Sequence, residues 1–211
     1  MAEPSREPAR KKKSIFREYA EAIIIALLLA LFIRTFVVQA FKIPSGSMEP
    51  TLLIGDHLLV SKFVYGVRNP FSGEVWVELG EPERYDVVVF KYPQNPSQDY
   101  IKRVIGLPGE TVEIRDKKVY VDGRPIDDPR AVFRDDEILP AGRQPRDNFG
   151  PEKVEPGELF VMGDNRDNSH DGRFWGMVDH TALRGRAFIL YWSWDHEERR
   201  VRWHRIGQSI N

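Results

Sequence analysis

Cysteine is absent from this 211-residue sequence. Its absence excludes disulfide bonds, thiolate nucleophiles and cysteine-ligated zinc, but it leaves the redox compartment open. An excess of charge is absent too, because 31 lysines and arginines face 32 aspartates and glutamates, for a formal net charge of -1. The chain therefore has no global reason to bind nucleic acid or an acidic partner. At this length, with 41% hydrophobic residues, we expect one folded domain.

Long apolar runs are confined to the N-terminal region. Residues 22–33 are all apolar, and residues 35–38 extend the run past Arg34 to about 17 residues, the short end of what crosses a bilayer. Arg34 lies near enough to the end to reach the lipid headgroups. Upstream, acidic Glu3 and Glu7 are outnumbered by Arg6, Arg10, Lys11, Lys12, Lys13 and Arg17. The positive-inside rule then predicts a cytoplasmic tail over residues 1–17, a transmembrane anchor over 18–38 and an extracytoplasmic domain over 39–211.

Two other interpretations of this region stay open. A basic start, an apolar stretch and then Val38-Gln39-Ala40 are also typical of a removable signal peptide with a small-residue cleavage site. Arg34, between the run and that site, and Glu21 at its head favour an anchor instead. A buried core helix is disfavoured, because no face of residues 22–33 is polar.

The remainder of the sequence predicts a mainly β fold, an antiparallel sheet preceded by the single apolar helix. Short β-branched and aromatic runs alternate with Gly, Pro, Asn and Asp. The candidate strands are LLVSKFV, VWVEL, DVVVFKY, DYIKRVIGL, TVEIR, KVYVDG, ELFVMG and RAFILYWSW. Asp122-Gly123 is a predicted tight turn. Residues 124–157, with six prolines and many charges, predict a surface insert or small cap.

The stretch KIPSGSMEPT, residues 42–51, places two serines around one glycine between two prolines. The first proline favours an extended backbone, so Phe41, Ile43 and Ser45 should project to one side. Gly46 then allows a sharp turn. A serine just after such a turn can expose its oxygen and aim its own N–H at a developing oxyanion, as acyl transfer requires. Taken alone, however, this composition favours an ordinary turn or linker.

A nucleophilic serine needs a base, and two kinds are available. The five histidines come without a G-x-S-x-G elbow, yet folding can assemble a Ser-His-Asp triad from distant residues. Lys102 lies in an apolar strand, where alternation puts it on one face with Tyr100 and Val104. To act as a base near neutrality, its pKa must fall by about three units, or about 4 kcal/mol of ammonium solvation, which a closed apolar pocket can supply. The alternative is an edge-strand lysine that reaches water.

The segment MGDNRDNSHDGRFWG, residues 162–176, is dense in polar groups yet lies between apolar strands. Its part from Asp167 to Gly172 matches the opening of a calcium-binding loop. Position twelve of that loop would be Val178 rather than glutamate. We therefore interpret the segment as a hydrogen-bonded loop whose hydroxyls and carboxylates brace a neighbouring element.

Together, PSGSMEPTL, the pair DVVVFKYP and DYIKRVIGLPGE, and GDNRDNSHDGR resemble the successive sequence boxes of type I signal peptidase, the bacterial leader peptidase, a Ser/Lys-dyad serine protease. The resemblance spans residues 41–194, apart from the insert. It implies that Ser47 is the nucleophile and Lys102 the general base. It also implies that Ser45 donates its hydroxyl to the oxyanion, beside the Ser47 N–H, and that Ser169 orients the Lys102 amine.

The resemblance assigns further supporting and substrate-binding positions. Asp171 and Arg173 match the family's structural ion pair, and Asp164 belongs to the same loop. The family cleaves after small residues at the first and third positions upstream of the cut, of the Ala-X-Ala type, and binds the peptide as an added β-strand. The positions that match its apolar pockets are Phe41, Ile43, Met48, Leu52, Val89, Tyr100 and Ile101. One departure is Tyr85, where the family commonly has glycine.

The implied function is a membrane-anchored endopeptidase that removes signal peptides from exported preproteins, without metal or other cofactor, on the outer face of the bacterial cytoplasmic membrane. Its partners would be signal peptides and membrane lipid. Nine residues from Val38 to Ser47 keep the nucleophile within about 30 Å of the membrane exit. A self-cleaving repressor-type Ser/Lys protease is a second hypothesis, which would require a DNA-binding domain before Ser47. A third is a catalytically silent, membrane-tethered peptide-binding module.

Overall fold

The structure is a computed structural model that describes residues 15–69, 75–77 and 79–211. The predicted cytoplasmic tail before residue 15, and one residue of the predicted strand VWVEL, lie outside the described residues. The expected fold class is confirmed: the chain is mainly antiparallel β, with one N-terminal apolar helix.

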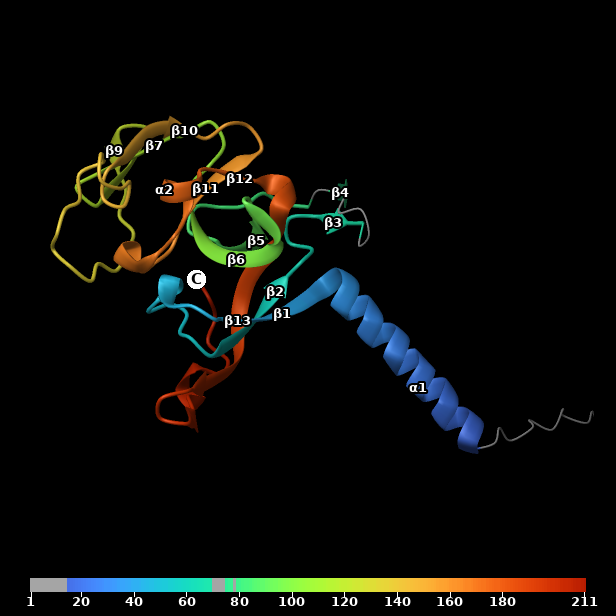
Figure 1. The fold of residues 1–211 in the computed structure, drawn as a ribbon. Helices are drawn as coiled ribbons and strands as arrows, with labels where there is room; N and C mark the ends of the chain where they lie inside the picture. The colour runs from blue at the N-terminus through green and yellow to red at the C-terminus, as the bar shows by residue number, and fades with distance from the viewer. Residues whose placement is uncertain (1–14, 70–74, 78) are drawn as a thin grey trace, which may run out of the picture.

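The N-terminal helix α1 (Ile15–Phe32) continues into a single π-helical turn, Ile33–Val37. The combined 23 residues are long and apolar enough to cross a membrane, and none of the helix is buried against the rest of the chain. Figure 1 shows α1 extending away from the body of strands. β1 (Val38–Lys42) begins at the next residue, so no linker separates the helix from the sheet.

The main sheet has the strand order β1-β2-β13-β5-β6-β11-β12, with β14 paired to β13, and every pair is antiparallel. Its remaining members are β2 (Asp56–Ser61), β5 (Val87–Tyr92), β6 (Asn95–Gly106), β11 (Glu158–Met162), β12 (Val178–Asp179), β13 (Leu183–Asp195) and β14 (Arg200–Val201). Short helices occupy the connections: Gly46–Met48, Arg166–Asn168, α2 (Gly172–Trp175), His180–Ala182 and Trp203–Arg205. A separate hairpin joins β3 (Val67–Arg68) to β4 (Val75–Val77).

Residues 87–90 of the central strand β5 are continuously apolar rather than alternating, and the packing on both faces of the strand explains this pattern. Val87 and Val89 pack into one hydrophobic cluster, and Val88 and Phe90 pack into another on the opposite side. A strand covered on both faces has no position for a solvent-facing polar side chain. Its neighbour β6 pairs with it in a register that sets Lys102 opposite Val88.

A second, four-stranded sheet has the order β10-β7-β8-β9: β7 is Thr111–Arg115, β8 Lys118–Val121, β9 Arg124–Pro125 and β10 Phe149–Lys153. Asp122 and Gly123, between β8 and β9, both have positive φ (50° and 73°), as a two-residue hairpin turn requires. The proline-rich segment 124–157 therefore starts and ends as strands of this sheet. Residues 126–148, called the 126–148 loop below, run between them, and Val132 of this loop forms a β-bridge with Asn165 of the active-site region.

Candidate active site

Ser47 and Lys102 lie 55 positions apart in the sequence and are in hydrogen-bond contact. Ser47 lies in the short helical turn Gly46–Met48, and Lys102 lies on β6. The Lys102 Nζ donates to Ser47 Oγ at 2.7 Å and to the main-chain oxygen of Ile101 at 3.0 Å. Both partners are uncharged, so the contacts hold the amine in place without an anion to stabilise its proton.

The Lys102 side chain is shielded from water, with 4% of the residue exposed. Burial lowers the pKa of this amine from 10.5 to about 8, against the opposing pull of the Asp171 and Asp164 charges. An appreciable fraction of the amine is therefore neutral near pH 7 to 8, and a neutral amine can accept the proton of a hydroxyl. The arrangement can generate a serine alkoxide, the nucleophile of acyl transfer.

A cavity of about 570 Å³ opens over this pair. Ser45 is exposed at its wall, and the buried Ser169 lies on the same cavity. Tyr100 and Ile101 line it as well, so it gathers six of the predicted site residues when Ser47 and Lys102 are counted. Lining residues that the sequence interpretation did not assign are Pro44, Asp99, Asp167, Asn168, His170 and Phe174.

Gly163 explains how Ser169 comes so close to the nucleophile turn. A Cβ at this glycine would lie 2.2 Å from Ser169 Oγ and 2.4 Å from the main-chain oxygen of Ser47. Any side chain would push the two segments apart. The Ser169 Oγ has no hydrogen bond of good geometry within the described part of the chain, although it is close enough to Asp171 to help lower the pKa of that carboxyl.

Asp164 forms a buried ion pair with Arg103, and the sequence interpretation identified only the aspartate. The Arg103 Nε and Nη2 donate to its two carboxylate oxygens, each at 2.7 Å. The Thr51 hydroxyl donates to the same carboxylate and ties it to the end of the nucleophile segment. Alternation along β6 puts Arg103 on the face opposite Lys102, and the sequence interpretation gave this arginine no role. Its signal was available, because an arginine inside an apolar strand needs a carboxylate partner.

Asp171 and Arg173 form an ion pair, as the resemblance implied, with Nε and Oδ1 at 2.8 Å. The Asp171 carboxylate also caps helix α2 by accepting from the Arg173 N–H, and it accepts from the Gly163 N–H at 3.0 Å. The pair therefore fixes the chain on both sides of Ser169.

The predicted substrate-binding residues divide into two groups. Tyr100 and Ile101 line the cavity, and Tyr100 stacks on Tyr92 with ring centroids 4.3 Å apart. The other five lie in or against the hydrophobic cluster beside it: Phe41, Ile43, Met48, Leu52 and Val89. Most of the predicted pocket wall is therefore core in this structure, with its side chains buried.

Tyr85, the departure from the family pattern, has φ of 75°, in the left-handed region that favours glycine. Its main-chain oxygen accepts from Arg103 at 2.7 Å, and its hydroxyl donates to the main-chain oxygen of Asp127 at 2.7 Å. The turn that glycine would permit is thus kept, and the tyrosine side chain gives it an added contact with the 126–148 loop.

Comparison with known proteins agrees with a serine hydrolase site of this kind. Residues 16–192 match the family described as "Signal peptidase, peptidase S26". The chain is 37% identical to Signal peptidase I of Pseudomonas aeruginosa, over 87% of this chain and 75% of that protein. It is 39% identical to Signal peptidase I of Leptolyngbya laminosa, over 90% and 87%. A solved signal peptidase I from Enterococcus faecalis is 30% identical, over 51% of this chain and 97% of that one, with a TM-score of 0.41.

The chain therefore belongs to the signal peptidase family, peptidase S26, and is a hydrolase of the serine peptidase class. Its single apolar helix fits a membrane-anchored member of that family.

Proposed function

We propose that this protein is a membrane-anchored serine endopeptidase that removes N-terminal signal peptides from exported preproteins, with Ser47 as nucleophile and Lys102 as general base. The observation that carries the proposal is the 2.7 Å contact between Lys102 Nζ and Ser47 Oγ, made by a buried amine whose pKa is lowered to about 8. Family membership supplies the reaction class, and this contact supplies its chemistry.

In the proposed reaction, neutral Lys102 takes the hydroxyl proton as Ser47 Oγ attacks the scissile carbonyl carbon. The oxyanion that forms is stabilised by the Ser47 N–H and the Ser45 hydroxyl. The Lys102 ammonium then gives its proton to the leaving nitrogen as the C–N bond breaks, which leaves an acyl-enzyme. Lys102 next deprotonates a water molecule that attacks the ester, and the released Ser47 oxygen regains a proton. Ser169, whose hydroxyl makes no hydrogen bond of good geometry within the described part of the chain, would orient the amine toward Ser47 during the reaction.

The proposed specificity is for small residues at the first and third positions before the cut, as in Ala-X-Ala. The peptide would lie in the cavity as an added strand, held by main-chain hydrogen bonds, with Tyr100 and Ile101 as walls. The buried set of Phe41, Ile43, Met48, Leu52 and Val89 would form the floor of the pockets beneath it.

We place the protein in the cytoplasmic membrane of a bacterium, with a single span. Residues 1–17 would be a cytoplasmic tail, 18–38 the anchor and 39–211 an extracytoplasmic catalytic domain that carries the 124–157 insert. The absence of any linker between helix and β1 supports a short, fixed distance between lipid and cavity. A preprotein is also anchored by an apolar segment, so its cleavage site and the enzyme's cavity share one layer.

The test is mass spectrometry of a model preprotein incubated in detergent with wild-type, Ser47→Ala and Lys102→Ala protein. Wild-type protein should cut after an Ala-X-Ala site, and both variants should leave the preprotein intact while still unfolding in a cooperative thermal transition. Near-normal turnover by either variant would reject the mechanism.

An acylating serine probe separates the enzyme from a catalytically silent binding module. It should label Ser47 in the wild-type protein and leave Lys102→Ala unlabelled. Peptide binding without labelling of the wild-type protein would favour the module instead.

A further inference from the structure

Three chain segments, called layers below, are joined one after another beside the catalytic cavity. The nucleophile turn is the first, residues 164–169 are the second and the 126–148 loop is the third. The Asn165 N–H donates to the main-chain oxygen of Ser47, and its Nδ2 donates to that of Gly46, each at 3.1 Å. On the other side, the Val132 N–H donates to the main-chain oxygen of Asp164 at 2.8 Å, and the Arg166 N–H donates to the main-chain oxygen of Val132 at 2.9 Å. The middle layer thus connects the nucleophile turn to the 126–148 loop.

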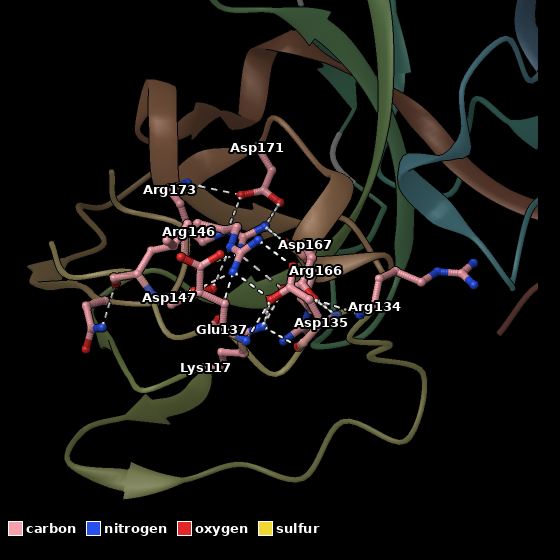
Figure 2. A network of polar contacts seen from close by, with 12 residues as sticks. Lys117, Arg134, Asp135, Glu137, Arg146, Asp147, Arg166, Asp167, Asp171 and Arg173 are labelled. Atoms are coloured by element: carbon pink, nitrogen blue, oxygen red, sulfur yellow. Dashed lines mark hydrogen bonds and ion pairs between the residues drawn. The ribbon is translucent and has the colours of Figure 1, made fainter. Parts of the chain in front are cut away.

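In the middle layer, the Asp167 carboxylate contacts the main chain of the 126–148 loop (Figure 2). Its carboxylate accepts from the main-chain N–H groups of Arg134 and Asp135, at 2.6 and 3.0 Å. The Lys117 Nζ donates to it at 3.0 Å, and the Arg146 Nε lies at 3.8 Å. Only 3% of the Asp167 side chain is exposed.

The position of Asp167 gives these contacts a consequence for the reaction. Asp167 lines the catalytic cavity, with Asn168 and Ser169 next to it in the chain. A carboxylate that receives two main-chain N–H groups and an ammonium is a strong, directional attachment. It therefore holds the cavity wall that includes Ser169 in register with the 126–148 loop.

The Arg134 side chain makes a second connection, an ion pair with Glu49 at 3.1 Å. Glu49 follows the nucleophile turn directly. The main chain of Arg134 thus binds the cavity wall and its side chain binds the nucleophile segment, so one residue of the 126–148 loop reaches both sides of the site.

We propose that Asp167 is a positioning residue for this reaction: through it, the 126–148 loop holds the Ser169 wall against the Ser47–Lys102 pair and keeps water away from the amine. The inference rests on the proposed function. Asp167 neither touches the reacting atoms nor transfers a proton. Its part is to keep a geometry in which a displacement of about 1 Å costs on the order of 100-fold in rate.

The groups that surround Lys102 make the effect measurable. Its Nζ contacts Ser47 and the Ile101 carbonyl, lies 5.6 Å from the Tyr100 ring centroid, and experiences the charges of Asp171, Asp164 and Arg173. Asp167 is not among them, so its removal acts on the amine only through displacement of the wall. Water admitted by that displacement would reduce the burial that lowers the Lys102 pKa.

The experiment measures kcat and its pH dependence for cleavage of a model preprotein by the full-length chain in detergent, normalised to folded protein. Asp167→Ala should lower kcat about 10- to 100-fold and move the midpoint of the pH profile above that of the wild-type protein, because a less buried Lys102 has a higher pKa. Asp167→Asn keeps an oxygen for the two main-chain N–H groups, so it should recover most of kcat. If Asp167→Ala does not fold, Asp167→Ser, whose shorter side chain cannot reach both N–H groups, takes its place: a smaller kcat with a raised midpoint supports the proposal, and wild-type values overturn it.

Asp147→Ala is the matched control. Asp147 belongs to the same network, its side chain is 1% exposed, and it accepts from Arg146 and from the Leu139 N–H, away from the cavity. It should lower the thermal transition while the pH midpoint stays at the wild-type value. An Asp167→Ala protein with the same transition loss and an unmoved midpoint would overturn the proposal.

The outcomes also separate this inference from the function on which it rests. Cleavage that survives Lys102→Ala rejects the proposed function. Cleavage that requires Lys102 and is indifferent to Asp167 rejects only the positioning role.

Discussion

Lys102 and Lys117 are both largely shielded from water, but only Lys117 has carboxylates in contact with its ammonium group. Lys102 donates to a hydroxyl and a carbonyl, and burial lowers its pKa to about 8. Lys117, with 11% of its side chain exposed, donates to Asp135 at 2.9 Å and Asp167 at 3.0 Å. Burial alone would lower the pKa of Lys117 as well, but these two carboxylates raise it above 10.5.

The difference shows that burial lowers the pKa of a lysine below its usual value only when no carboxylate contacts the ammonium group. In the network of Figure 2, nearly every cation has a carboxylate in contact, so the charges are retained and hold chain segments together. In the cavity one amine is kept apart from any such contact. The ion pairs thus fix the surroundings of Lys102, the lysine that would lose its proton in the proposed mechanism.

The comparison is tested most severely by removing the unpaired amine. Lys102→Met should lower kcat by about 1,000-fold or more, because a general base is lost while the apolar volume is kept. Preprotein cleavage, normalised to folded protein, gives the value. Lys118→Met, at an exposed lysine of β8, is the control and should cleave at the wild-type rate. A Lys102→Met rate within tenfold of wild type would show that the amine is not the base.

The same substitution should stabilise the fold near pH 7. A lysine whose pKa falls from 10.5 to about 8 on folding opposes folding by about 3 kcal/mol wherever both states are protonated, which is below pH 8. The penalty fades as pH rises from 8 to 10.5, since the folded state loses its proton first. The gain of Lys102→Met in the free energy of unfolding should therefore shrink over that range in urea titrations. A constant gain would mean that the lysine is not perturbed.

Lys117→Met should act in the opposite direction. Its paired ammonium stabilises the folded state below pH 10.5, and this contribution is lost as pH rises through the higher folded pKa. We expect a loss of about 1–2 kcal/mol in the free energy of unfolding near pH 7, as for charged hydrogen bonds that are partly shielded. Urea denaturation measures it, and a neutral or stabilising result would contradict the comparison.

Arg134→Gln should have the smallest effect on stability, about 0–1 kcal/mol, because its pair with Glu49 is largely exposed. Its effect should appear in kcat, by a few-fold, since the pair joins the 126–148 loop to the nucleophile segment. Arg115→Gln, in an exposed pair with Glu113 on the second sheet, removes a similar charge far from the cavity and should leave kcat unchanged. Equal kcat in the two variants would show that the Arg134–Glu49 pair does not contribute to catalysis.

Much of the fold follows from local sequence patterns. The apolar run gave the helix, and alternation in β6 placed Ile101 against one hydrophobic cluster and Tyr100 and Val104 against another. β1 was missed, because its residues were interpreted as the end of a membrane span or as a cleavage site. The ends of the proline-rich segment were missed as strands too, since β10 pairs with β7 across more than thirty positions, and its sequence FGPEK lacks β-branched residues.

The site was predictable only in part. The residues alone left a histidine and a lysine open as the base, and Ser47 and Lys102 were singled out by the order of three motifs rather than by spacing. The place of Arg103 inside an apolar strand could have predicted its carboxylate partner, whereas nothing in the sequence around Asn165 predicted its contacts. Its importance comes from main-chain contacts with Ser47, Gly46 and the Val132 bridge, and such contacts depend on tertiary position rather than on residue type.

In the proposed location, the direct passage from α1 into β1 would couple this chemistry to the lipid. The Lys62 N–H donates to the main-chain oxygen of Val37 at 3.0 Å, and its Nζ donates to that of Thr35, so the residue that follows β2 is bonded to the π-helical turn at the end of the helix. With no swivel at the base, any tilt of a membrane-embedded α1 carries the cavity with it. Helix tilt responds to the thickness of the hydrocarbon layer. Bilayer composition would then set the height at which this enzyme cuts.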